Sequence, residues 1–570
     1  MFSNIPLNYN EIMITTKNLR SLLPLACLLL TTNPSARADD DLDNFNHLFD
    51  ENVVDFVQDH EFEAGIETSA GAIAECLIKL GAVKILQQPF YLRTNPLNQR
   101  SLLDDPLFLP QRNYCHHWVV GSHLFWNQTE RCNFTAKSTA ISSYLGVFNE
   151  KFLSLLDDAL PILKECVPSA DINPRDLLPL FANMTPQERR FGFMLHAQRQ
   201  WQKAHFRIMA PIYYLERNFY LTDEEQIAIE TAFTPLFGPG SQDEQFEFAQ
   251  AHFISDKLGL GDTRITFDVT VKDNDCTFAN IGLLTTLPTS VTFASALMGT
   301  EFKKECERPT LSLQRLAELS LSEGKEGQIK AAAQVQEFLL SALDAFSANI
   351  LDTKLGDYRH VGLGLFSEGE FTPFNSTCRP WANNIKLHNR ITIEYLFPAS
   401  EIRYYVQKND TSGFKKLNLL RSKEAIINEI KENPAYAGKV LDFLENQFID
   451  NLFPFTFKTS VHPGVMFEWT PTLFYEGKYW GTRLGGDFWL QGKEKLKDIC
   501  VVSTDGRPRN IDIEKATKPL AYEGKVLGTI FYKVNRPERV WTLSLNGDKT
   551  VFRSGIGKDF MVSFNVEANF

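Results

Sequence analysis

Beyond its first forty residues, the sequence contains no apolar run as long as a transmembrane helix. A helical crossing needs about 20 consecutive apolar residues, so this absence excludes a helical membrane protein. Mean hydropathy is low, at -0.21, yet 12% of the residues are aromatic, including 45 Phe. Apolar residues that alternate with polar ones give this combination. An integral membrane protein of this composition must be a β-barrel, because only helices and closed barrels satisfy every backbone hydrogen bond in lipid.

The chain also lacks the short motifs of common catalytic and phosphate-binding sites. It has no Gly-Xaa-Ser-Xaa-Gly elbow, no His-Glu-Xaa-Xaa-His helix and no phosphate-cradling glycine loop. The net charge of -12 argues against nucleic-acid binding. We therefore expect no enzyme activity and no cofactor, although Ser, His and Asp residues from separate segments could still meet in space.

The last eleven residues, 560–570, alternate with a period of two, as in a β-strand. One face carries Phe560, Val562, Phe564, Val566, Ala568 and Phe570, and the other carries Met561, Ser563, Asn565, Glu567 and Asn569. A tilted strand of this length spans a bilayer, with its uncharged face toward lipid and its polar face toward an aqueous lumen. The alternative is the last strand of a soluble β-sandwich.

This amphipathic strand with a terminal Phe resembles the C-terminal assembly signal of Gram-negative outer-membrane β-barrel proteins. The resemblance covers one strand and names no specific family. It implies an outer-membrane location, lipid around the barrel, and recognition of the strand ending at Phe570 by the barrel-assembly machinery.

Further segments show the same alternation. The stronger ones are 191–197, 206–212, 265–271, 279–283, 361–366, 385–395, 465–469, 480–490, 526–534 and 541–545, and the weaker ones are 83–93, 118–126 and 134–136. Together with the last strand they predict an all-β fold, a transmembrane antiparallel β-barrel of about 12–14 strands.

The N-terminus predicts export. Lys17 and Arg20 precede the apolar segment 22–30, and Ala36-Arg37-Ala38 follows, so residues 1–38 are typical of a secretory signal peptide cleaved after Ala38.

Three further regions complete the predicted organisation. Residues 39–82 are interpreted as a periplasmic extension or a plug, and residues 83–570 as the barrel. Apolar residues at three- and four-residue spacing predict α-helical insertions in long external loops, near 311–351 and 425–453.

The lengths of the connections predict the orientation of the barrel. If the C-terminus is periplasmic, counting backward places the short turns near Gln200, Asn274, Gly477 and Pro537 on the periplasmic side. The long helical insertions then face outside, which is the arrangement of outer-membrane barrels.

One cluster of metal-ligand residue types is visible in the sequence. Cys115, His116 and His117 lie near His123 and Cys132. Thiolates and imidazoles bind zinc, but the spacing fits no zinc-finger pattern. In an exported chain we expect Cys115 and Cys132 to form a disulfide across a hairpin rather than a metal site.

Reading the polar face of each predicted strand inward gives the candidate pore-lining residues. They are Arg190, Arg207, Arg264, Asp268, Lys386, Arg390, Glu394, Arg483 and Asp487. Basic residues outnumber acidic ones in this set, which predicts a lumen with mild anion preference. The alternative is that opposite charges pair across strands and only stiffen the wall.

The sequence therefore predicts an outer-membrane channel or transporter for passive passage of small solutes, anionic ones included. Its helical insertions resemble, in organisation only, those of fatty-acid and hydrocarbon transport barrels. The alternatives are a structural or adhesive surface barrel without transport, an outer-membrane hydrolase, and a secreted soluble β-protein.

Overall fold

The computed structural model describes residues 118–131, 187–219, 254–274, 276–292, 298–299, 351, 354–357, 359–374, 380–407, 455–500, 511–536 and 539–569. All of them belong to one compact unit that spans residues 64–570.

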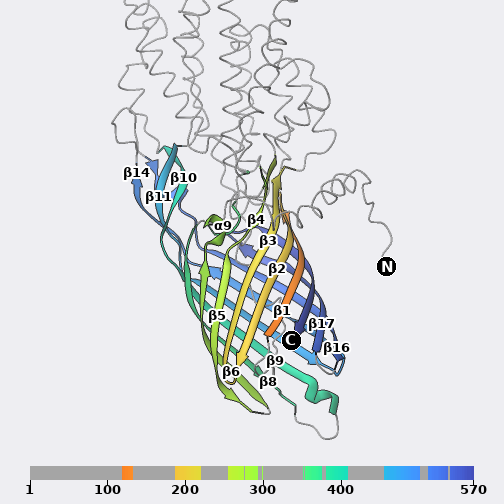
Figure 1. Ribbon diagram of the computed structural model, residues 1–570. Coiled ribbons are helices and arrows are strands. Elements are labelled where there is room, and N and C mark those ends of the chain that lie inside the picture. The colour runs from red at the N-terminus through yellow and green to blue at the C-terminus, as the bar shows by residue number, and fades with distance from the viewer. Residues whose placement is uncertain are drawn as a thin grey trace, which may run out of the picture. The chain divides into compact units, whose positions relative to one another are not determined.

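Twelve antiparallel strands close into a β-barrel (Figure 1). They are β1 (Trp118–Arg131), β2 (Gln187–Trp201), β3 (Ala204–Asn218), β5 (Thr263–Asp273), β6 (Thr277–Leu287), β8 (Gly362–Phe371), β9 (Ile385–Leu396), β12 (Met466–Glu476), β13 (Trp480–Gln491), β16 (Ala521–Arg536), β17 (Arg539–Ser554) and β18 (Lys558–Asn569). Each strand pairs with the next barrel strand along the chain, and β18 pairs with β1 to complete the circle. A closed barrel has no free edge, so every strand finds hydrogen-bonding partners on both sides.

The predicted barrel is confirmed at the lower end of its expected size. Each predicted segment that falls within the described residues is a barrel strand. The barrel closes without the weak segments 83–93 and 134–136, which lie outside the described residues.

Exposed apolar residues and buried polar residues alternate along the strands. Leu365 and Ile530 are 59% and 64% exposed on the outer surface, whereas Ser563 and Asn565 are buried inside. In water this apolar exterior would be unfavourable over so large an area, but lipid accepts it. The strands therefore span a membrane, and the prediction for the last strand is confirmed through Asn569.

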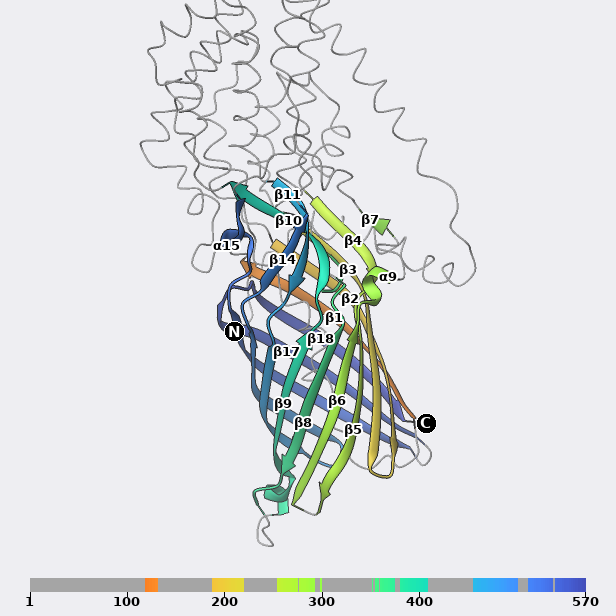
Figure 2. The same ribbon diagram turned by 90° about the vertical axis from the view of Figure 1, so that its left-hand side faces the viewer.

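The strand ends joined by short connections and those joined by long ones lie at opposite ends of the barrel (Figure 2). The turns β2–β3, β5–β6, β12–β13 and β16–β17 are short, and together with the β8–β9 connection, which contains the 3-10 helix η3 (Pro380–Asn384), they share one end. The strand ends that the long connections join lie at the other end, together with one tight turn between β17 and β18, where Gly555 has a φ of 71°. This grouping agrees with the prediction that the four short turns share one end of the barrel. That this end faces the periplasm stays a prediction.

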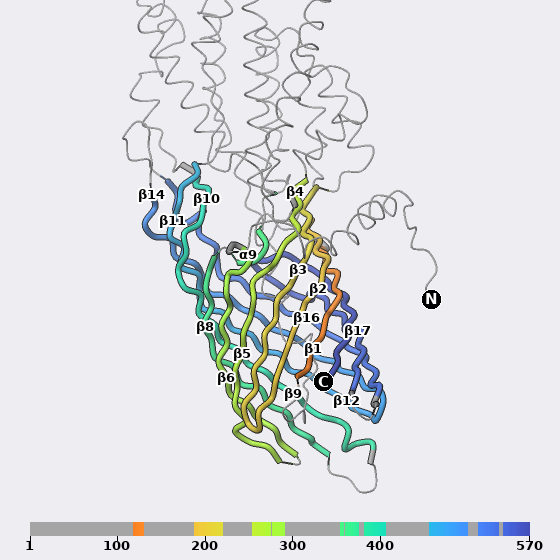
Figure 3. The backbone as a smooth tube through the Cα atoms, viewed as in Figure 1, coloured from red at the N-terminus to blue at the C-terminus, as the bar shows by residue number. Residues whose placement is uncertain are grey.

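A second, four-stranded sheet lies at the long-connection end. It consists of β14 (Lys495–Cys500), β11 (Phe455–His462), β10 (Ala399–Gln407) and β15 (Ile511–Asp512), in that order. The first three lie side by side in Figure 3, and α15 (Ile513–Ala516) packs against β10. Its core contains Tyr405, Phe455, Phe457 and Ala516. The sequence analysis did not predict this sheet.

Three small elements extend the barrel wall at the same end. β4 (Ile254–Leu260) pairs with β3, β7 (Met298–Gly299) pairs with β4, and α9 (Thr289–Thr292) follows β6. Among the described residues, no helix reaches the length and apolar character needed to cross a membrane.

Several predictions fall outside the described residues. They concern the signal peptide at 1–38, the extension at 39–82, the pair Cys115 and Cys132, the helical insertions at 311–351 (apart from Leu351) and 425–453, and the terminal Phe570. These stay predictions.

Candidate functional site: the charged interior of the barrel

All nine predicted pore-lining residues lie on the strand faces that point into the barrel. Seven of them are buried, and Arg207 and Lys386 are half-buried. Period-two alternation produces this arrangement, because every second side chain of a barrel strand points inward. Their role as pore-lining residues stays a prediction. The structure shows which of them meet.

Arg264 and Glu394 form an ion pair between β5 and β9, across the two strands β6 and β8 that lie between them. Arg264 Nη2 on β5 donates to Glu394 Oε2 on β9 at 3.0 Å, and Thr286 Oγ1 on β6 donates to the other carboxylate oxygen at 2.8 Å. The intervening strand β8 carries Gly362 at this level. A Cβ at Gly362 would lie 1.8 Å from Glu394 Oε1, so the glycine leaves the space that the carboxylate occupies.

A second group joins β8 and β9. Glu368 accepts a hydrogen bond from Arg390 Nη1 at 3.2 Å and pairs with His388 Nε2 at 2.9 Å. The Arg390 guanidinium also lies 4.3 Å from the centroid of the Phe366 ring, a cation–π contact. One predicted basic residue is therefore neutralised by a carboxylate that the sequence analysis did not include.

A third group surrounds Lys525 on β16. The ammonium lies 2.9 Å from Asp559 and 3.3 Å from Asp548, and Glu523 is 3.9 Å away. Asn127 Nδ2 of β1 also donates to Asp559 at 2.7 Å. Three carboxylates share one ammonium here, so this part of the interior carries net negative charge when all four groups are ionised.

Lysines and glutamates also meet near the short-turn end. Lys386 lies 3.3 Å from Glu370 and 2.8 Å from Glu476, and Lys533 pairs with the same Glu476. These residues come from β8, β9, β12 and β16, so the contacts tie four strands together.

The remaining predicted residues have other polar partners. Asp268 accepts from Asn280 Nδ2 at 2.7 Å and pairs with His205 Nδ1 at 2.8 Å. Asp487 accepts from Thr470 Oγ1 at 2.8 Å, and Arg483 Nε donates to Thr472 Oγ1 at 3.2 Å.

Arg190 has its partner on its own strand, β2, and Arg207 on β3 has its partner on the neighbouring strand β2. Arg190 Nη2 lies 2.6 Å from Glu188, and Arg207 Nε donates to Gln198 at 3.2 Å.

Sequence reasoning missed many interior carboxylates. They are Glu188, Glu368, Glu370, Glu476, Glu523, Asp548 and Asp559. Most lie near strand ends, beyond the last apolar residue of the outward-facing series. The predicted strands stopped with that series and so did not include them. Glu188 precedes Arg190 by two positions, and Asp559 precedes Met561 by two. Extending each strand by its period of two would have found them.

A polar cluster outside the membrane-spanning segments links the barrel to the small sheet. His360 Nε2 lies 2.6 Å from Glu401 Oε1 on β10, and Nδ1 lies 2.7 Å from the carbonyl oxygen of Phe397. Arg403 bridges Glu401 and Glu494 at 2.9 and 3.1 Å. With an acceptor at both ring nitrogens, His360 is placed to hold two protons, that is, a positive charge.

Solved structures similar to this chain are barrels of the outer membrane and of autotransporters. An outer-membrane channel of Pseudomonas putida F1 is 7% identical, with 81% of this chain and 97% of that chain covered and a TM-score of 0.37. The toluene transporter TodX of Pseudomonas putida is 8% identical, with 84% and 96% covered and a TM-score of 0.28. The transport unit of the autotransporter AIDA-I from Escherichia coli is 7% identical, with 82% and 95% covered and a TM-score of 0.26.

Neither a protein-family model nor a curated protein sequence matches the chain. At these TM-scores the fold assignment rests on the strand pairing itself, which closes a barrel with a charged interior and an apolar exterior.

Proposed function

We propose that the protein is an outer-membrane channel for passive passage of small solutes. The observation that carries this proposal is the ionisable interior, which fills the space where a soluble barrel would place an apolar core. Buried charges cost free energy unless they are paired and hydrogen-bonded, and a polar interior is typical of membrane barrels through which solutes pass.

The path that we propose is narrow. Arg190 is 0% exposed and Arg483 is 2% exposed, and Asp559 and Glu523 beside Lys525 and Arg264 beside Glu394 are also buried. Side chains this little exposed do not border a wide water-filled pore. Solutes would pass by displacing individual side chains, with the Arg264–Glu394 pair as one such constriction.

We propose that charge selectivity is weak. The predicted anion preference rests on basic residues such as Arg264, Arg390 and Arg483. The interior carboxylates that sequence reasoning missed oppose this preference, because fixed negative charge raises the local concentration of cations. Small solutes of either charge are the substrate class that this interior supports best.

Proteoliposomes provide the test. Vesicles containing the purified protein would be loaded with a small anionic dye or a cationic dye of similar size, and release would be timed. We expect slow release of both dyes. Arg264→Ala should accelerate release several-fold because it removes a guanidinium from the constriction, whereas Lys495→Ala, exposed on β14, should not. If neither the natural protein nor Arg264→Ala releases dye, the channel proposal fails and a structural or adhesive barrel is favoured.

We also propose that the barrel-assembly machinery recognises the C-terminal strand. β18 alternates as such a signal requires and continues to Asn569. We expect Phe570→Ala to lower the amount of folded, heat-modifiable barrel in outer membranes. Phe564→Ala, which removes a lipid-facing ring within the same strand, is the comparison. Equal loss in both variants would indicate a general folding defect and contradict the recognition proposal.

A further inference from the structure

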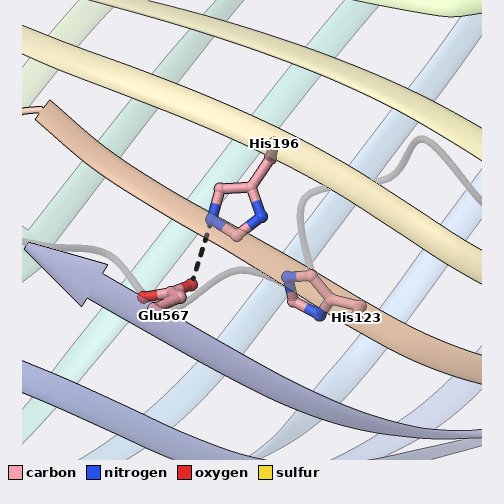
Figure 4. A group of neighbouring side chains, drawn as sticks. All are labelled: His123, His196 and Glu567. Carbon is pink, nitrogen blue, oxygen red and sulfur yellow. Dashed lines mark ion pairs between the residues drawn. The ribbon is translucent and has the colours of Figure 1, made fainter. Parts of the chain in front are cut away.

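Two histidines and a glutamate meet inside the barrel where its first and last strands join. His123 on β1, His196 on β2 and Glu567 on β18 offer ligand atoms that all lie within 4.8 Å of one another (Figure 4). All three residues are buried, with exposed fractions of 0%, 3% and 2%. Sequence reasoning associated His123 with the neighbouring cysteines, but the fold brings it to residues far away in the chain.

Gly121 provides the space in which these side chains meet. Its position on β1 is opposite His196 on one side and Glu567 on the other. A Cβ at Gly121 would lie 2.2 Å from His196 Cε1 and 2.9 Å from Glu567 Cγ. Only a residue without a side chain allows His196 and Glu567 to approach each other across β1.

The resulting geometry is close to that of a metal site. His196 Nε2 lies 3.5 Å from Glu567 Oε1, and the two imidazole rings are tilted at 52° with their centroids 5.1 Å apart. Two ligand atoms bound to one tetrahedral zinc are roughly 3.3 Å apart, since each bond is about 2.0 Å long. The pair is close to this spacing, and the ligand atom of His123 lies within 4.8 Å of both.

We propose that His123, His196 and Glu567 bind one divalent transition-metal ion. Two imidazoles and a carboxylate are a set that zinc accepts, and they leave a fourth position for water. Asn565 supports the site, because its Nδ2 donates to Glu567 Oε1 at 3.1 Å and orients the carboxylate.

The position of the site indicates its role. Its ligands come from the last strand and the first two strands of the barrel, so the metal joins the two ends of the barrel-forming chain across the seam between β18 and β1. A ligand that binds only the closed barrel stabilises it against unfolding. The metal therefore acts as a cross-link of the seam, and this role does not depend on the proposed channel activity.

Metal binding is tested on the purified full-length protein in detergent after treatment with a chelator. Zinc would be titrated against a chromophoric competitor, and cobalt would report ligand geometry through its visible absorption. We expect one zinc per chain and a tetrahedral cobalt spectrum. His123→Ala and His196→Ala should each weaken binding at least about 100-fold. His205→Ala, another histidine of the barrel interior, should leave binding unchanged.

Two further variants keep all three ligands and guard against misfolding of the histidine variants. Asn565→Ala should weaken zinc binding by about 10-fold or more, and Gly121→Ala should weaken it by forcing His196 and Glu567 apart. Zinc should also raise the temperature at which the folded band is lost on gels. We expect this only in the proteins that bind zinc tightly, the natural protein and His205→Ala. Absence of binding, or equal binding in the natural protein and His196→Ala, would overturn the proposal in favour of a simple histidine–glutamate pair.

Discussion

Single glycines decide which interior charges can meet. In a barrel wall, neighbouring strands are close enough for a side chain to lie over the next strand, provided that strand has no Cβ there. Gly362 makes room for Glu394 to reach Arg264, and Gly121 makes room for His196 to reach Glu567. The glycine positions are therefore as important for the interior as the charged residues themselves.

The first prediction concerns Gly362. Replacing it with Ala forces Glu394 away from Arg264, and such overpacking should lower the free energy of unfolding by about 1–3 kcal/mol. Urea unfolding in lipid vesicles measures this. Gly369→Ala on the same strand is the matched control, because its Cβ would meet only the Phe278 carbonyl oxygen at 3.6 Å, an ordinary contact. Equal stability of the two variants would contradict the crowding at Gly362.

The second prediction concerns His360. Burial lowers the pKa of His360, but the hydrogen bond to Glu401 and the nearby charge of Asp357 outweigh it and raise the pKa above the ordinary value. The contribution of this contact to stability is complete below the unfolded pKa of about 6.5 and is lost as pH rises through the higher folded pKa. Thermal unfolding at a series of pH values above 6 would show it.

Glu401→Gln provides the control for that titration. It keeps the size of the side chain but removes the charge that stabilises protonated His360, with Arg403 still beside it. We expect the loss of stability with rising pH to be smaller in this variant. If the pH profile of stability is the same in both proteins, groups other than His360 and Glu401 cause the loss of stability.

At the scale of strands, the arrangement of connections implies a definite orientation. The turn between β12 and β13 contains Lys478 at the short-turn end, and α15 contains Lys515 at the opposite end. With a membrane-impermeant thiol reagent, we expect Lys515→Cys to be labelled on intact cells and Lys478→Cys only after the outer membrane is opened. The unsubstituted protein supplies the background from its native cysteines. The reverse labelling pattern would show that the barrel has the opposite orientation in the membrane.

Strands were predictable from the sequence because one face had to be uniformly apolar. In β18, Val562 and Phe564 face outward between Ser563 and Asn565, so period-two alternation identifies both the strand and its orientation. The small sheet was not predictable in this way. Its strands are short and separated by long segments, and their apolar residues, such as Tyr405 and Phe455, form a local core rather than a lipid-facing stripe.

The interior was predictable only in part. Alternation showed that Arg264 and Glu394 point inward, since both lie opposite apolar neighbours. It could not show that they pair, because β5 and β9 are not adjacent and the strand order and register depend on the closed barrel. The meeting of His123 with Glu567 was hidden for the same reason, as it depends on the pairing of the first and last strands.

At the scale of the whole molecule, lipid contact with the outer surface implies that the free-energy cost of an outward-facing charge depends strongly on its depth in the membrane. Leu545, near the middle of β17, is 55% exposed, and Leu520, just before β16 at the long-connection end, is 48% exposed. We expect Leu545→Arg to cost about 2–4 kcal/mol of folding free energy, and Leu520→Arg about 0–1 kcal/mol. Urea titration in vesicles compares them. Similar small losses would indicate that the exterior does not face lipid.

Conductance of the purified protein in a planar bilayer, recorded in a salt gradient, tests the proposed channel most directly. We expect stepwise currents of small amplitude and a reversal potential close to zero, because interior basic and acidic side chains oppose each other in a narrow path. A reversal potential that indicates strong anion selectivity would contradict weak charge selectivity and support the anion preference predicted from the basic residues. Barrels that insert but pass no current, even with Arg264→Ala, would contradict the channel itself.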